Sequence, residues 1–294
     1  MIRIGTRGSK LALAQTKKVI VSLAERGIEA EQVIITTKGD KVTDCGLHKI
    51  GSYGVFVREL DNAILSGEID AAVHSMKDIP AERPEGLRTV AVLPRDSPND
   101  FLVTKKTRED IHVIGTSSLR RKAQIRRNFG DTVVVKDLRG NIDTRLAKLE
   151  SGEFDAIVLA EAGLQRLNIS VPGFRLPVDD FIPSPNQGTI AVVSRDTPEL
   201  RALLSPLNDA VSERDTESER AVMEELGGGC FTPQGVYCHG GKLIAEVLSL
   251  DGTRVERLSS DNMSAESARA LGRDLRKRAL PLIQEAKSVL EVMK

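Results

Sequence analysis

The feature that most constrains the fold of this chain is an internal duplication. Residues 66–73 read SGEIDAAV and residues 151–158 read SGEFDAIV, so the segments differ only at Ile69/Phe154 and Ala72/Ile157. A second matched pair lies upstream, because IGT at 4–6 and IGT at 114–116 each end a short apolar run and begin a helical pattern. Two matched features in the same order indicate two related halves rather than chance similarity between turns rich in glycine and serine.

Each half reads as strands that alternate with helices. In the first half we expect strands at 3–4, 32–37, 69–73 and 87–93, and helices at 10–26 and 55–65. In the second half we expect strands at 113–114, 132–135 and 156–159, and helices at 119–129 and 142–149. Gly27 and Gly130 end the first helix of each half as C-terminal caps. Alternating strands and helices predict a mostly parallel sheet covered on both faces.

The chain is expected to cross between the halves twice before a third part begins. After Pro183 a strand-like segment at 189–193 returns to the first half. The third part begins near Asp209 and has strand-like segments near Val236 and at 243–250, a hairpin turn at Asp251-Gly252, and a helix at 265–292 interrupted near Pro281. We therefore predict an α/β protein of three domains: residues 1–94 with 189–207, residues 97–186, and a small α+β domain at 210–294.

The charge of the chain is balanced overall but segregated along the sequence. The 42 basic and 42 acidic residues argue against a uniformly basic nucleic-acid binder, and the absence of Trp with only 2 Tyr and 7 Phe argues against base-stacking platforms. Residues 115–148 nevertheless hold nine basic and three acidic side chains, whereas residues 209–226 hold two basic and seven acidic ones. The basic block is a candidate site for a small anion.

Three predicted strand-to-helix turns favour an anion. They contain Thr6, Arg7 and Ser9, then residues 115–118 followed by Arg120 and Arg121, and finally Arg139, Gly140 and Asn141 followed by Arg145. Backbone N–H groups and the helix dipole favour anions at such turns, and arginine forks add bidentate carboxylate recognition. Because these turns follow the carboxyl ends of strands, they should line one crevice. The phosphate-loop and dinucleotide-binding glycine motifs are absent, so we expect a ligand with several carboxylates or phosphates.

Two further segments could carry chemistry. Asp78 follows the strand at 69–73 beside Lys77, where it is either a proton donor or cation stabiliser, or an acid that caps the next turn. His74 is either a general base or a packed residue. Cys230 follows three glycines without an adjacent base, and the acidic residues upstream would raise the pKa of its thiol. That context favours permanent covalent attachment over a protease-type nucleophile.

The cysteine pattern and the apolar segments bear on location and metals. Cys45, Cys230 and Cys238 form no CxxC pair, and a metal site built from Cys230, Cys238 and His239 is less favoured than ordinary thiols. The sequence has no signal-peptide pattern and no apolar run of about 18 residues. We therefore expect a cytoplasmic protein that binds no metal, membrane or nucleic acid.

The assembled motifs resemble the porphobilinogen deaminase (hydroxymethylbilane synthase) family in its own order over residues 2–235. They are IGTRGSKLALAQ, GDK, GVFVREL, AVHSMKDIP, GTSSLRRKAQ, DLRGNIDTRL, DAIVLAEAGLQRL and GGGCFTPQG. The resemblance implies two duplicated α/β domains of the type II periplasmic-binding-protein kind and a small α+β C-terminal domain. It implies a monomeric transferase of tetrapyrrole and heme biosynthesis that joins four porphobilinogen molecules head to tail, releasing ammonia and forming hydroxymethylbilane.

The resemblance also assigns residues. It implies a dipyrromethane cofactor, made from the substrate itself and held by a thioether to Cys230. Asp78 matches the catalytic acid, which assists ammonia loss and stabilises the resulting cation. Cofactor binding is implied for Ser75, Lys77, Thr116, Ser117, Ser118, Arg120, Arg121, Arg139 and Gly140, and substrate binding for Arg7, Ser9, Arg145, Arg166 and Gln187.

The sequence departs from the family pattern in a few places. Gly51-Ser52-Tyr53-Gly54 stands where bacterial members commonly have GGKG, which puts a cationic role of the 38–54 loop in doubt although Lys49 and Arg58 lie nearby. Thr232-Pro233-Gln234 stands where valine-proline-isoleucine is usual. Two other interpretations remain: a non-catalytic two-lobed module that binds a polycarboxylate, and a phosphate-binding transferase.

Overall fold

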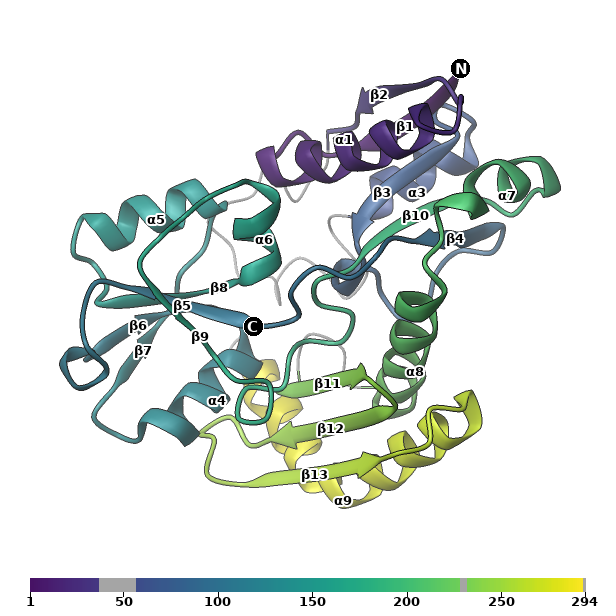
Figure 1. Ribbon diagram of the computed structural model, residues 1–294. Helices are drawn as coiled ribbons and strands as arrows, with labels where there is room; N and C mark the ends of the chain where they lie inside the picture. The colour runs from purple at the N-terminus through teal and green to yellow at the C-terminus, as the bar shows by residue number, and fades with distance from the viewer. Residues whose placement is uncertain (37–56, 228–231, 293–294) are drawn as a thin grey trace. The chain divides into compact units, whose positions relative to one another are not determined.

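The structure is a computed structural model that describes residues 1–36, 57–227 and 232–292 (Figure 1). The chain divides into two compact units, unit 1 with residues 1–96 and 188–214, and unit 2 with residues 97–187 and 215–294. This division places most of the predicted third domain in unit 2.

Unit 1 contains a five-stranded sheet in the order β2-β1-β3-β10-β4. Its strands are β1 (Ile2–Thr6), β2 (Ala30–Ile34), β3 (Ala71–Ser75), β4 (Leu87–Val92) and β10 (Ile190–Arg195), and its helices are α1 (Lys10–Ala24), α3 (Arg58–Leu65), α7 (Pro198–Leu204) and the short 3-10 turns η2 (Met76–Asp78) and η4 (Ser205–Leu207). Val19 and Leu23 of α1 pack on one face of the sheet, whereas Leu60 and Ile64 of α3 pack on the other. The predicted covering of both faces is confirmed for this sheet.

Unit 2 contains a second five-stranded sheet, in the order β7-β6-β8-β5-β9. Its strands are β5 (Asp100–Thr104), β6 (Val113–Gly115), β7 (Val134–Lys136), β8 (Ala156–Ala160) and β9 (Gly173–Arg175), and its helices are α4 (Leu119–Phe129), α5 (Ile142–Glu150), α6 (Glu161–Arg166) and the 3-10 turn η3 (Arg108–Asp110). In both sheets the first three strands are parallel and the last two pairings are antiparallel.

Strand register confirms that the two sheets are duplicates. Gly5 of β1 pairs with Ala72 of β3, and Gly115 of β6 pairs with Ile157 of β8, which is the equivalent position of the second repeat. The repeated aspartates are also equivalent, because Asp70 accepts the backbone N–H of Arg3 at 2.9 Å and Asp155 accepts that of Val113 at 2.8 Å. The repeated carboxylate therefore fixes the start of the first strand in each half.

The repeated glycine is explained by the side chain that packs on it. A Cβ at Gly5 would lie 2.2 Å from Cδ1 of Ile69, and a Cβ at Gly115 would lie 2.8 Å from Cδ1 of Phe154. Ile69 and Phe154 are the equivalent apolar residues of the two repeats. Each half therefore requires a glycine where this side chain crosses the first strand.

The prediction of a mostly parallel sheet is wrong, because both five-stranded sheets contain parallel and antiparallel pairs. In each sheet a strand that arrives from the other half inserts antiparallel before the last strand: β10 between β3 and β4, and β5 between β8 and β9. The predicted return at 189–193 is confirmed by β10, whereas β5 and β9 lie in segments that local sequence patterns left unassigned.

The C-terminal part of the chain forms an antiparallel sheet in the order β11-β12-β13. Its elements are α8 (Ala210–Leu226), β11 (Gln234–His239), β12 (Lys242–Leu248), β13 (Val255–Ser260) and α9 (Ala265–Val292). Helix α9 continues through Pro281 rather than breaking there, because Ala279, Leu282 and Ile283 around the proline are buried in the core of this sheet. None of the helices in the described ranges is long and apolar enough to span a bilayer.

Candidate active site

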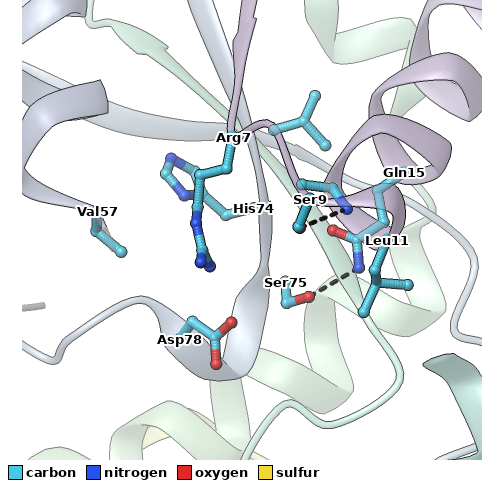
Figure 2. Close-up of a pocket in the computed structure, with 10 residues that line it drawn as sticks. Arg7, Ser9, Leu11, Gln15, Val57, His74, Ser75 and Asp78 are labelled. Carbon is cyan, nitrogen blue, oxygen red and sulfur yellow. Dashed lines mark hydrogen bonds between the residues drawn. The ribbon is translucent and has the colours of Figure 1, made fainter. Parts of the chain in front are cut away.

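A pocket in unit 1 lies at the carboxyl ends of β1 and β3 (Figure 2). Because these strands are parallel neighbours, the turns that follow them meet at the same edge of the sheet. The lining residues are Arg7 and Ser9 after β1, Leu11, Ala12 and Gln15 of α1, Val57, and Val73, His74, Ser75 and Asp78 at the end of β3 and in η2. Four of the residues singled out from the sequence, Arg7, Ser9, Ser75 and Asp78, thus line one pocket.

Asp78 is held at the pocket by its buried neighbours. Met76 and Ile79 are 3% and 2% exposed, and their backbones are joined by a hydrogen bond from the Ile79 N–H to the Met76 carbonyl at 3.1 Å. Asp78 itself is exposed and points toward Arg7 across the pocket in Figure 2. Among the described residues its carboxylate accepts no hydrogen bond, so the turn-capping alternative finds no support. A carboxylate that is exposed at a pocket and accepts no hydrogen bond from the described residues can bind a cationic group and exchange a proton.

His74 does not suit the role of general base. It is 5% exposed, and within the described ranges its Nε2 has no hydrogen-bond partner. Burial, with the nearby charges of Arg83 and Arg7, lowers the pKa of His74 to about 3. The imidazole is therefore neutral near pH 7 and a weak base, which favours the packed interpretation.

Polar side chains of α1 complete the pocket. The Ser9 hydroxyl accepts the Ala12 N–H at 3.3 Å and caps α1, so its oxygen is already used in the turn. Gln15 donates from Nε2 to the Ser75 hydroxyl at 2.8 Å. Gln15 is not among the residues predicted from the sequence, although its place in ALAQ, on the helix that follows the anion-favouring turn at residues 6–9, is a usable signal. Lys77 lies on η2 and is half-buried outside this pocket lining.

In unit 2 the equivalent turns follow β6 and β7. The Ser117 hydroxyl donates to the Leu138 carbonyl and accepts the Leu138 N–H, both at 3.1 Å, so it joins the two turns. Ser118 caps α4 by accepting the Arg121 N–H at 3.5 Å, and the Thr116 hydroxyl accepts the Ser118 N–H at 3.3 Å. These three hydroxyls build the turn from which the arginines project.

Arg145 lies in a cluster of like charges. Its Nε donates to the carbonyl of Gly140 at 2.8 Å, and Gly140 has a φ of 111° that favours glycine. Burial, and then the charges of Arg121 and Arg139, lower the pKa of Arg145 to about 10. Partly buried guanidinium groups that repel one another favour an anionic ligand between them. This cluster fits the carboxylates of a dipyrromethane group.

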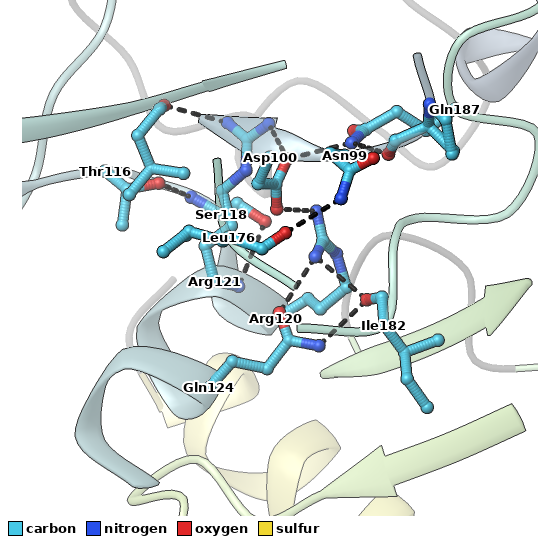
Figure 3. Close-up of polar contacts among 12 residues, drawn as sticks. Asn99, Asp100, Thr116, Ser118, Arg120, Arg121, Gln124, Leu176, Ile182 and Gln187 are labelled. Atoms are coloured by element: carbon cyan, nitrogen blue, oxygen red, sulfur yellow. Dashed lines mark hydrogen bonds and ion pairs between the residues drawn. The ribbon is translucent and has the colours of Figure 1, made fainter. Parts of the chain in front are cut away.

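Arg120 and Arg121 are both buried and share the carboxylate of Asp100 (Figure 3). Arg121 Nη2 lies 2.6 Å from Asp100 Oδ1, and Arg120 Nη2 lies 2.9 Å from Oδ2. Gln187 donates from Nε2 to Asp100 Oδ1 at 2.8 Å. Asp100 is not among the residues predicted from the sequence, although two arginines on a buried helix face require a counter-ion.

Other predicted residues lie apart or outside the described ranges. Arg166 is half-buried on α6, which follows β8 directly. Cys230 and the 38–54 loop fall outside the described residues. Cys238 is fully buried in the apolar core of the C-terminal sheet, as expected of an ordinary thiol.

Comparisons with known families match almost the whole chain. Residues 2–201 match the family described as porphobilinogen deaminase, dipyromethane cofactor binding domain, and residues 214–281 match porphobilinogen deaminase, C-terminal domain. The chain belongs to the porphobilinogen deaminase family. The predicted family, transferase class and dipyrromethane cofactor are thereby confirmed, and the non-catalytic binding module is no longer needed to explain the site.

Individual relatives support this assignment over most of both chains. The chain is 52% identical to a probable porphobilinogen deaminase of Methanosarcina acetivorans, with 92% of this chain and 90% of the relative covered. It is 46% identical to one of Archaeoglobus fulgidus, with 93% and 97% covered, and 43% identical to the porphobilinogen deaminase of Syntrophobacter fumaroxidans, with 94% and 93% covered.

Solved structures also show a weak likeness. The methionine binding protein MetQ aligns over 70% of this chain and 89% of its own, with a TM-score of 0.44 and 11% identity. A periplasmic substrate-binding protein of an ABC transporter from Coxiella burnetii aligns over 72% and 94%, with a TM-score of 0.43 and 14% identity. The strand orders described above, rather than these scores, carry the description of the fold.

Proposed function

We propose that ammonia release and pyrrole coupling take place at the unit 1 pocket, with Asp78 as the catalytic acid. The observation that carries this proposal is the exposed Asp78 carboxylate, held by two buried neighbours and directed toward Arg7. Porphobilinogen has acetate, propionate and aminomethyl groups, so its recognition calls for both a cation and an anion. Arg7 and Asp78 supply one of each.

Asp78 would act on the positive charge of the substrate. When the carbon–nitrogen bond of the aminomethyl group breaks, nitrogen keeps the electron pair and leaves as ammonia, and the positive charge remains on the pyrrole. A fixed carboxylate beside the pyrrole N–H stabilises that charge where it develops. The α carbon of the attacking pyrrole then forms the new carbon–carbon bond and gives its proton to the Asp78 carboxylate, which can pass it to the released ammonia to form ammonium. Ser9, Ser75 and Gln15 line the same pocket and would orient the substrate.

The unit 2 turns would hold the carboxylates of the dipyrromethane cofactor and of the growing chain. When bound, the cofactor supplies the covalent primer, attached to Cys230 as the family resemblance implies. Support comes from the cluster of Arg121, Arg139 and Arg145, whose mutual repulsion an anion would relieve. Further cofactor and substrate contacts are proposed for Lys77, Thr116, Ser117, Ser118, Arg120, Gly140, Arg166 and Gln187.

The proposal is tested by Asp78→Asn, with Glu82→Gln as the matched control on an exposed carboxylate nearby. We expect Asp78→Asn to keep the covalent cofactor, measured by intact mass, and to lose on the order of 10²-fold or more in kcat. Glu82→Gln should retain wild-type turnover. Equal turnover of the two variants would remove Asp78 from the catalytic role.

The monomeric state and the cytoplasmic location expected from the sequence remain proposals. Size-exclusion chromatography with light scattering on the loaded protein tests the first, with the mass of one chain as the expected result.

A further inference from the structure

Asp100 is a buried carboxylate on which the proposed ligand residues of unit 2 converge. It begins β5, is 0% exposed, and receives Arg120, Arg121 and Gln187 (Figure 3). These three side chains come from α4 and from the segment that leads into β10. All three are residues to which the family resemblance gives a ligand, yet here they bind a carboxylate of the chain itself.

One further nitrogen of each arginine, Nη1, is also directed at protein oxygens, whereas Nε of Arg121 is buried without a partner among the described residues. Arg120 Nη1 donates to the Gln124 side chain at 2.8 Å and to the Ile182 carbonyl at 3.0 Å, and Arg121 Nη1 donates to the Val158 carbonyl at 3.0 Å. Two guanidinium groups buried without an anion would be strongly unfavourable. Asp100 supplies a negative charge in direct contact with both guanidinium groups, which stabilises this arrangement.

Helix α4 is also held by polar contacts to the C-terminal sheet. Gln124 donates from Nε2 to Glu246 Oε1 at 2.8 Å, and Glu246 Oε2 binds Arg257 Nη2 at 2.6 Å. Glu246 is fully buried in β12. The helix that carries Arg120 and Arg121 is therefore also anchored to the C-terminal sheet, through Gln124, whose side-chain oxygen accepts a hydrogen bond from Arg120.

We propose that Asp100 is a built-in counter-ion that binds the guanidinium groups of Arg120 and Arg121 in the cofactor-free chain. When the cofactor binds, some of the N–H donors of these groups bind ligand carboxylates instead. Asp100 is thus a positioning residue. The inference rests on the proposed function, in which these arginines bind cofactor carboxylates. Ligand carboxylates also supply negative charge and hydrogen-bond acceptors to the two arginines. Asp100 therefore contributes more to the stability of the cofactor-free protein than to that of the loaded protein.

The test measures thermal midpoints of the cofactor-free and loaded full-length chain for Asp100→Asn and for Asp137→Asn. Asp137 pairs with Lys122 of the same helix but is exposed, so its variant is the matched control. We expect Asp100→Asn to lower the cofactor-free midpoint on the order of 10 °C and the loaded midpoint by less than half as much. Succinate should raise the cofactor-free midpoint of Asp100→Asn more than that of wild type or Asp137→Asn. Equal losses in both forms, with no extra effect of succinate, would overturn the proposal.

A double variant keeps the test decisive if Asp100→Asn fails to fold. Asp100→Asn combined with Arg120→Gln removes one charge of each sign, so it should fold and melt above the single variant. A double variant that is no more stable than the single one would overturn the counter-ion role. Arg145→Gln separates this inference from the proposed function, because Arg145 has no bond to Asp100. If Arg145→Gln assembles the cofactor at the wild-type rate, the proposed anion site fails, whatever Asp100→Asn shows.

Discussion

Mild acid should destabilise the folded chain through His74, a buried imidazole that lines the same pocket as Asp78. In the folded state the pKa of His74 is lowered to about 3, against 6.5 for an unperturbed histidine. The unfolded chain therefore binds a proton between these values that the folded chain does not, and stability falls as pH falls below 6.5. Between pH 7 and pH 5 this linkage costs about 2 kcal/mol of unfolding free energy. Carboxylates contribute little in that window, since their pKa values lie lower.

Urea unfolding at pH 7 and pH 5 measures this effect. His74→Asn removes the titrating group, so its free energy of unfolding should change by less than about 0.5 kcal/mol between the two pH values. His112→Gln, at an exposed histidine, should keep the full loss. A His74→Asn variant that loses as much stability as wild type would show that His74 is not held neutral and that the charges of Arg83 and Arg7 do not act on it.

Two further predictions concern the parts of unit 2 that support the arginine turns. Gly252→Ala should lower the free energy of unfolding by about 3 kcal/mol or more, because its Cβ would lie 2.2 Å from the Ala123 carbonyl oxygen of α4. Gly240 is also at positive φ but faces open space, so Gly240→Ala should lower it by about 1 kcal/mol in the same thermal unfolding assay. Asp155→Asn should cost about 1–2 kcal/mol, since Asp155 accepts the N–H groups of His112 and Val113. Lys106 and these N–H groups lower the pKa of Asp155 to about 2, so the stability that Asp155 contributes is present above pH 4 and is lost as pH falls toward 2. In urea unfolding, the free energy of unfolding of Asp155→Asn should therefore fall less steeply below pH 4 than that of wild type. Equal losses of stability in the two glycine variants would contradict the packing assigned to Gly252. A wild-type dependence of stability on pH below pH 4 in Asp155→Asn would contradict the role of its charge.

Local patterns predicted the repeated core of each half well. The SGE-D repeat and the IGT turns predict two equivalent strands in each half, and the structure pairs β1 with β3 and β6 with β8 in equivalent registers. The strand β5 could not be predicted in this way, because its antiparallel insertion is fixed by the chain crossing from one half to the other. The interruption predicted near Pro281 is wrong for a related reason. A local rule predicts a break at a proline, whereas packing on the C-terminal sheet keeps α9 continuous.

The candidate site shows the same division between local and long-range information. The turn after β1 and the segment after β3 place Arg7, Ser9, Ser75 and Asp78 around one pocket. They could not show that Arg120 and Arg121 share Asp100, because that pairing joins residues about twenty positions apart through the packing of α4 on β5. Nor could they distinguish the two interpretations of His74, since its protonation depends on burial and on Arg83, which lies outside the motif.

The most direct test of the central claim is the intact mass of the purified chain from cells that make porphobilinogen. We expect a mass above that of the polypeptide by one dipyrrole, mapped by peptide analysis to Cys230 and missing from a Cys230→Ser variant. An unmodified wild-type chain, or a dipyrrole attached at another residue, would contradict it.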